Sequence, residues 1–235
     1  MNMPQESLNY LPRGKDKIPM RYLRFLPAGL EENRNEKWPL ILFMHGAGER
    51  GHDPDILKKH GIPKIVETRP GFGFITISPQ CEIGASWDGY IETLEALLDE
   101  TVLTLPVDTG RVYLTGISMG GQGVWRLAVE IPDRFAALVP ICGYGPPTQG
   151  FPERVCMLKD VPVWVFHGAD DDIVPLEESR KMVAALEACG GNVRFTIYPD
   201  TGHDSWTRTY DNPELYRWLL KHDLSEKTRD QKIRR

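Results

Sequence analysis

The sequence has no long hydrophobic run, and this absence excludes several classes of protein. No apolar stretch approaches the roughly 18 residues that a membrane-spanning helix needs. The N-terminal residues 1–17 contain no apolar core of the kind found in secretory signals, so we expect no signal peptide. Both absences predict a cytoplasmic protein without a membrane partner.

Cysteine is scarce and its spacing is irregular. The four cysteines contain no C-x-x-C pair, so they do not indicate a metal cluster. Three of them lie in or beside apolar segments, which favours buried free thiols. The positions are Cys81, Cys142, Cys156 and Cys189.

An excess of positive charge is also absent. The chain has 28 Lys and Arg against 33 Asp and Glu, a net charge of −5. This balance gives no reason to expect nucleic acid or an anionic membrane surface as a partner. With 235 residues and no internal repeat, the chain can bury one sizeable core. We expect one domain over 1–222 and a charged, disordered tail over 223–235.

Apolar runs alternate with segments of helical spacing along most of the chain. Continuous apolar runs indicate buried parallel strands, and the alternation predicts an α/β fold with a doubly wound, mostly parallel sheet. Residues 20–27 alternate in polarity and can pair with 8–12 as an antiparallel N-terminal edge. The apolar runs lie at 39–46, 72–79, 111–116, 135–143, 161–168 and 192–199, and the helical segments at 87–105, 120–132, 176–191 and 212–222.

Gly116-Ile117-Ser118-Met119-Gly120 fits the pattern G-x-S-x-G between a predicted strand and a predicted helix. This context is typical of a nucleophile elbow, which raises a serine hydroxyl above the end of a sheet. The alternative is a glycine-rich turn in which Ser118 only caps the helix. In a doubly wound sheet, ligands bind beyond the carboxyl ends of the strands, so the site is predicted there.

His203 follows the last predicted strand and is the candidate base, with a surface loop histidine as the alternative. His45 and His167 each belong to a His-Gly pair after a strand, which favours structural hydrogen bonding. His45, His52 and His60 with Asp53 are possible metal ligands, but their irregular spacing on a predicted loop argues against a metal site.

The candidate acid lies among Asp170, Asp171 and Asp172. Three adjacent aspartates cannot all point under one imidazole. Two of them should be solvated or cap the helix that begins near Pro175. Residue chemistry alone leaves the choice open. The order Ser, Asp, His nevertheless supplies the nucleophile, acid and base that acyl transfer needs.

Four motifs resemble those of α/β-hydrolase-fold serine carboxylesterases, over roughly residues 18–222. The similarity is to compact phospholipase/carboxylesterases, dienelactone hydrolases and polyhydroxybutyrate-depolymerase-like esterases. The motifs are H-G-A-G at 45–48, G-I-S-M-G-G at 116–121, H-G-A-D-D-D-I-V-P at 167–175 and G-H at 202–203; the segment 78–87 is also similar.

This resemblance implies Ser118, Asp171 and His203 as the triad. It also implies the N–H groups of Met119 and Ala47, or of Gly48, as the oxyanion hole, with no cofactor and no metal. Dienelactone hydrolases proper carry cysteine as the nucleophile, so their substrate is not implied for this serine-bearing chain.

The segment 143–160 has room for one short helix and not for a cap domain. We therefore expect a serine carboxylesterase that hydrolyses small, soluble, short-chain esters through an acyl-enzyme intermediate, unless 50–64 folds over the site. Trp87, Tyr90 and Trp206 either line the substrate or pack into the core.

Two other functions stay open from the sequence. One is a serine peptidase of the prolyl-oligopeptidase kind, although the chain is too short for a propeller domain. The other is a binding protein that keeps the fold without chemistry. The sequence does not fix the oligomeric state; a monomer is favoured.

Overall fold

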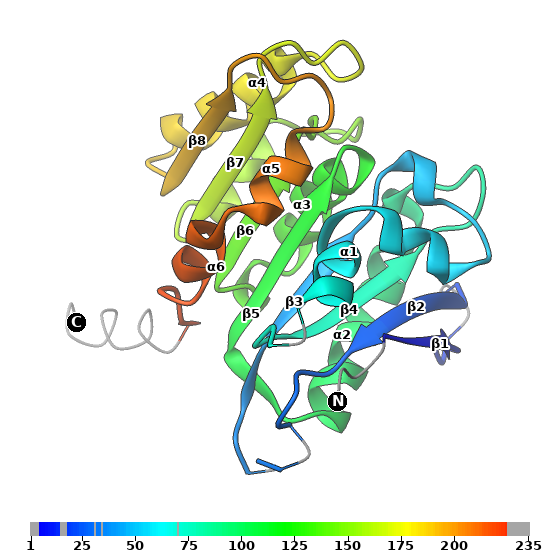
Figure 1. The fold of residues 1–235 in the computed structure, drawn as a ribbon. Coiled ribbons are helices and arrows are strands. Elements are labelled where there is room, and N and C mark those ends of the chain that lie inside the picture. Colours follow the sequence, from blue (N-terminus) through cyan, green and yellow to red (C-terminus); the bar gives the residue numbers. More distant parts are fainter. Residues whose placement is uncertain (1–4, 15–17, 31, 34, 70, 225–235) are drawn as a thin grey trace, which may run out of the picture.

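Eight strands form one mixed sheet in the computed structural model, which describes residues 5–14, 18–30, 32–33, 35–69 and 71–224 (Figure 1). The order across the sheet is β1-β2-β4-β3-β5-β6-β7-β8; β1, β2 and β4 pair antiparallel and every other pair is parallel. This confirms the predicted fold with an antiparallel N-terminal edge. The strands are β1 Glu6–Tyr10, β2 Met20–Phe25, β3 Trp38–Met44, β4 Ile75–Gln80, β5 Val107–Ile117, β6 Ala137–Ile141, β7 Val163–Gly168 and β8 Val193–Tyr198.

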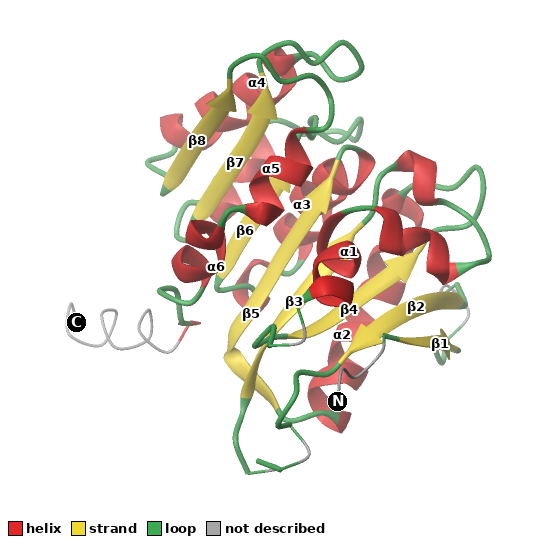
Figure 2. Ribbon diagram, in the orientation of Figure 1, coloured by secondary structure: helices red, strands yellow, loops and turns green. Residues whose placement is uncertain are grey.

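Helices cover both faces of the sheet (Figure 2), and each face has its own apolar cluster. One cluster joins the sheet to α2 Ile91–Thr104, α3 Met119–Glu130 and α4 Leu176–Ala188; the other joins it to α1 Gly61–Thr68, α5 Ser205–Asp211 and α6 Pro213–Leu219. The neighbours Leu42 and Phe43 on β3 belong to opposite clusters, because successive side chains of a strand point to opposite faces. The central strands are apolar throughout for this reason.

Short helices were the least predictable elements. The periodicity does not predict α1, whose first turn contains Gly61 and Pro63, or α5, which has only seven mostly polar residues. The segment predicted as one helix from residue 87 begins as the 3₁₀ helix η3 Trp87–Tyr90 before α2. Further 3₁₀ turns are η1 Ala47–Glu49, η2 Pro54–Lys59 and η4 Pro132–Arg134.

No large cap covers the sheet in the described chain. Between β6 and β7 the only regular element is the 3₁₀ helix η5 Glu153–Leu158, as predicted. None of the described helices is long and apolar enough to cross a membrane. Residues 225–235 of the predicted tail lie outside the described residues.

The cysteines divide into two kinds. Cys81 and Cys142 are buried and free, as predicted. Cys156 on η5 and Cys189 just after α4 form a disulfide, so the prediction of free thiols is wrong for these two. They are 33 positions apart and meet only because α4 packs against η5. The sequence contains no local signal for that contact.

Candidate active site

Ser118 lies on the sharp turn between β5 and α3. Its backbone has φ 52° and ψ −115°, a conformation that non-glycine residues rarely adopt. Its N–H donates to the carbonyl of Ile141 on β6 at 2.9 Å, which holds the strained turn in place. The hydroxyl is therefore presented at the carboxyl end of the sheet, where α3 begins.

The glycines of the motif are required by close backbone contacts. A Cβ on Gly116 would lie 2.5 Å from the carbonyl oxygen of Gly120, and a Cβ on Gly120 would lie 2.0 Å from that of Met44. No side chain fits at such distances. The G-x-S-x-G pattern thus reflects how tightly α3 packs over the ends of β3 and β5.

His203 connects the serine to an acid. Its Nε2 lies 2.9 Å from Ser118 Oγ and its Nδ1 lies 2.8 Å from Asp171 Oδ2. A carboxylate only accepts hydrogen bonds, so Nδ1 carries the proton and the Nε2 lone pair faces the hydroxyl. This tautomer can take a proton from Ser118.

Asp171 is the aspartate that lies under the imidazole. Its side chain is fully buried, and Oδ1 accepts the N–H groups of Ile173 at 3.0 Å and Val174 at 2.9 Å. Asp170 and Asp172 are exposed, and no side chain caps the start of α4. The two outer aspartates are therefore solvated rather than capping.

The structural hydrogen-bonding role predicted for His167 is confirmed, and its ring is also a second imidazole on Asp171, a contact that was not predicted. Its Nε2 lies 3.1 Å from Asp171 Oδ2 and 2.9 Å from the carbonyl of Val174, so Nε2 carries the proton. Burial lowers the pKa of His167, and the neutral ring accepts from Ser179 Oγ at 2.7 Å through Nδ1. The i, i+4 spacing of His167 and Asp171 was the available signal.

His45 holds the loop after β3 in place through two hydrogen bonds. Its Nε2 accepts the N–H of Cys81 at 2.9 Å, and its Nδ1 donates to the carbonyl of Gly46 at 2.5 Å. Burial lowers the pKa of His45 to about 4, so the ring is neutral. The hydrogen bond from Cys81 to His45 joins the ends of β3 and β4.

The predicted oxyanion donors lie beside the serine. Ala47 and Gly48 are exposed in η1, next to Gly46, whose ideal Cβ position is 3.6 Å from Ser118 Cβ. Met119 is the first residue of α3, where N–H groups lack an intrahelical acceptor. Met119 adjoins the serine in the chain, and η1 follows the Gly46 that lies against it.

The three predicted substrate-binding aromatics have different positions. Trp87 is 0% exposed and donates from Nε1 to the carbonyl of His45 at 3.0 Å; Tyr90 is 2% exposed. Both pack into the core, so the structure contradicts a substrate-lining role for them. Trp206 is half-buried, with its ring 5.2 Å from that of His203.

One group of side chains in the described chain could hold a metal ion. Ligand atoms of Cys142, Asp171 and His203 lie within 4.8 Å of one another. Asp171 and His203 are already hydrogen-bonded to each other, and burial raises the pKa of the Cys142 thiol to about 12. A protonated thiol is a poor metal ligand. The arrangement fits acyl transfer better than metal binding.

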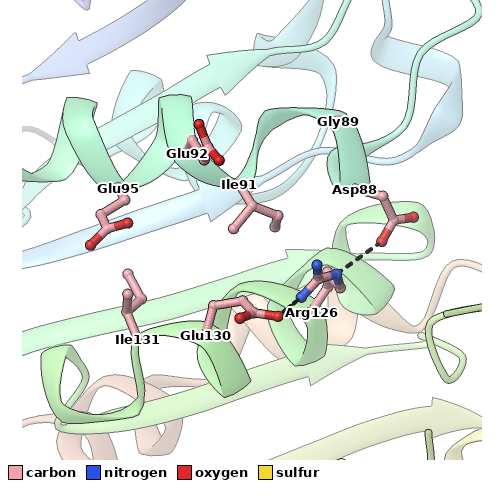
Figure 3. A pocket seen from close by; sticks show the side chains of 8 residues that line it. All are labelled: Asp88, Gly89, Ile91, Glu92, Glu95, Arg126, Glu130 and Ile131. Carbon is pink, nitrogen blue, oxygen red and sulfur yellow. Dashed lines mark hydrogen bonds and ion pairs between the residues drawn. The ribbon is translucent and has the colours of Figure 1, made fainter. Parts of the chain in front are cut away.

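A polar cavity of about 420 Å³ lies between α2 and α3 (Figure 3). No triad residue lines it. Arg126 extends between Asp88 and Glu130 and pairs with both. The lining residues are Asp88, Gly89, Ile91, Glu92, Glu95, Arg126, Glu130 and Ile131.

Comparisons with known proteins identify sequence and structural relatives of this chain. Residues 72–212 match the phospholipase/carboxylesterase family. The chain is 27% identical over 203 residues to a bifunctional acetylxylan esterase/xylanase of Neocallimastix patriciarum, and 27% identical over 162 residues to acyl-protein thioesterase 1 homolog 2 of Dictyostelium discoideum. A solved thermostable esterase superposes with a TM-score of 0.79 at 30% identity.

The matches cover the chains to different extents. They include 83% of this chain and 27% of the Neocallimastix protein, and 57% of this chain and 70% of the Dictyostelium protein. For the thermostable esterase they include 93% of this chain and 63% of that chain. This chain therefore spans about a quarter of the first relative and less than two thirds of the solved esterase.

Proposed function

The chain belongs to the phospholipase/carboxylesterase family, and we propose that it is an ester hydrolase that acts on short-chain carboxylic esters through an acyl-enzyme formed on Ser118. The observation that carries this proposal is the continuous contact from Ser118 Oγ to His203 and on to Asp171, at 2.9 and 2.8 Å. The strained elbow and the hydrogen bond that orients His203 on Asp171 support it.

The first half of the reaction acylates the serine. Ser118 Oγ attacks the ester carbonyl while its proton moves to His203 Nε2. The carbonyl electron pair moves to the oxygen, which the N–H groups of Met119 and Ala47 stabilise. Loss of one such donor commonly costs ~10²–10³ in rate. Collapse of this intermediate expels the alcohol, which takes the proton from His203.

The second half releases the acid. Water attacks the acyl-enzyme and gives its proton to His203, and the Ser118–acyl bond breaks with return of that proton to Ser118 Oγ. Asp171 stabilises the imidazolium in both halves and stays ionised. Neither half uses a metal or a cofactor.

The preference for short acyl groups rests on the missing cap. Only η5 lies between β6 and β7, so little apolar surface is available to bury a long chain. Each methylene left in water forgoes ~0.8 kcal/mol, about fourfold in rate. The Neocallimastix relative is named for an acetyl ester, which supports the same preference. Rates on 4-nitrophenyl esters from acetate to decanoate test it; a maximum at decanoate would contradict it.

Ser118→Ala tests the nucleophile. We expect hydrolysis of 4-nitrophenyl acetate to fall by at least ~10⁴-fold with unchanged thermal unfolding. A fluorophosphonate should label the wild type at Ser118, as located by peptide mass mapping, and the exposed Ser7→Ala variant should label equally. Labelling of another serine would overturn the assignment.

The same preparation separates the other two functions. A peptidase would cleave a prolyl 4-nitroanilide faster than the acetate ester, and a binding protein without chemistry would not label at all. We expect labelling together with a preference for the ester.

A further inference from the structure

Glu49 is a buried carboxylate beside the nucleophile that the proposed reaction does not use. It is 8% exposed and ends η1. The ideal Cβ position on Gly46 is 3.1 Å from Glu49 Oε2 and 3.6 Å from Ser118 Cβ. Glu49 and Ser118 therefore lie against the same face of Gly46.

The Glu49 carboxylate has no hydrogen-bond donor among the described residues. The nearest partner is His60 Nε2, 3.8 Å from Oε1, which is too long for a hydrogen bond. An ionised carboxylate can accept about four hydrogen bonds, and the Glu49 oxygens are not among the fully buried, unpartnered polar atoms of the described chain, so water reaches them. A hydroxyl of a bound substrate can replace that water as the donor.

His60 and Trp206 connect this carboxylate to the triad. The Trp206 ring lies 5.5 Å from the His60 ring and 5.2 Å from the His203 ring, edge to face in both cases. The His60 side chain is 35% exposed. Glu49, His60 and Trp206 thus form a surface beside His203, the residue that protonates the departing alcohol.

We propose that Glu49 and His60 form a subsite for the alcohol part of the ester, selective for alcohols that carry further hydroxyls, such as glycerol or a sugar. This inference rests on the proposed esterase function and specifies its leaving group. A hydroxyl can donate to Glu49 while it accepts from His60, so it satisfies both groups. An ammonium has only donors, and a simple alkyl chain leaves the carboxylate without any.

Two acetate esters with the same carbon skeleton test the subsite. We expect the wild type to hydrolyse 2,3-dihydroxypropyl acetate with a kcat/KM at least about tenfold above that for propyl acetate. Glu49→Gln should reduce this ratio about tenfold or more, as loss of a hydrogen bond to a charged group does. Its kcat/KM for propyl acetate should stay within about threefold. His60→Ala should lower the ratio in the same direction.

Glu82→Gln is the matched control, since Glu82 is an exposed carboxylate just after β4 at the same edge of the sheet. It should leave the ratio unchanged. A wild-type ratio near one would overturn the subsite without any variant, whether or not Glu49→Gln folds. An equal loss on both esters in Glu49→Gln, or faster hydrolysis of acetylcholine than of the dihydroxypropyl ester, would also overturn it. Failure of the esterase proposal is distinguishable, because then neither ester reacts and Ser118 does not label.

Discussion

Two polar regions lie beside α3. In one the charged side chains pair with each other, and in the other a carboxylate has no hydrogen bond from the described residues. Beside the cavity of Figure 3, Arg126 lies 3.5 Å from Asp88 and also pairs with Glu130, which in turn accepts from Arg154 at 3.0 Å. At the N-terminus of α3, Ser118 is strained and Glu49 has no donor in the described chain. The residues for which we propose chemistry are the strained Ser118 and the Glu49 without a hydrogen-bond donor, not those around the cavity.

The paired region favours the ionised form of Glu130. Burial alone would raise the pKa of Glu130, but hydrogen bonds from Arg126 and Arg154 outweigh it and lower that pKa. The partners are partly exposed, and such pairs contribute little to stability. This region is therefore a structural contact between α3 and its neighbours.

The largest expected effect is at the acid of the site. Asp171→Asn should reduce kcat for 4-nitrophenyl acetate by about 10³–10⁴-fold, because an amide favours the wrong imidazole tautomer. Asp170→Asn and Asp172→Asn are matched controls and should retain most activity, since both side chains are exposed. Steady-state kinetics on the three variants measure this. If Asp170→Asn or Asp172→Asn were the inactive variant, that residue and not Asp171 would be the acid of the triad.

A smaller effect concerns His45 and pH. Its pKa is about 4 in the folded protein and about 6.5 unfolded, so between these values the unfolded chain binds more protons. Stability should therefore be complete above pH 6.5 and fall as the pH drops towards 4, by about 3 kcal/mol from this residue.

Urea unfolding at pH 7 and pH 4.5 measures that loss. His45→Gln cannot titrate, so its free energy of unfolding should change less between the two pH values than that of the wild type. An equal change in both proteins would show that other groups cause the acid sensitivity.

The smallest effect is expected in the paired region. Arg126→Met keeps the apolar stem and removes both ion pairs, so the free energy of unfolding should fall by at most about 1 kcal/mol. Activity on 4-nitrophenyl acetate should stay within twofold. A tenfold loss of activity would show that the residues around the cavity contribute to the reaction, and the contrast between the two regions would be wrong.

Features encoded by local sterics were predictable from the sequence. The elbow is one, because Gly116, Ser118 and Gly120 lie within five positions. A Cβ on Gly116 would clash with the backbone of Gly120, and a Cβ on Gly120 would clash with the end of β3. The order of strands and helices is another, since burial of both sheet faces makes the strands apolar throughout.

Features that depend on contacts between distant loops were not predictable from residue chemistry alone. That chemistry left the choice of Asp171 open, and only the family resemblance implied it, because the choice depends on the loops after β7 and β8 lying together, where Asp170 N–H donates to the carbonyl of Thr201 at 3.0 Å. The contact between Glu49 and His60 was not predictable either, because it joins the short helix η1 to the residue that ends η2. Trp87 carries no mark in the sequence that separates a core position from a substrate-lining one.

The four contacts to Asp171 have a consequence for the motion of the site. Two backbone N–H groups meet Oδ1, and His167 and His203 meet Oδ2, so all the lone-pair directions are occupied. The carboxylate is not exposed to solvent, these contacts hold it in one orientation, and its conformational entropy is lost when the chain folds. A proton arriving on His203 then meets dipoles that are already oriented, and no reorganisation energy is added at that step.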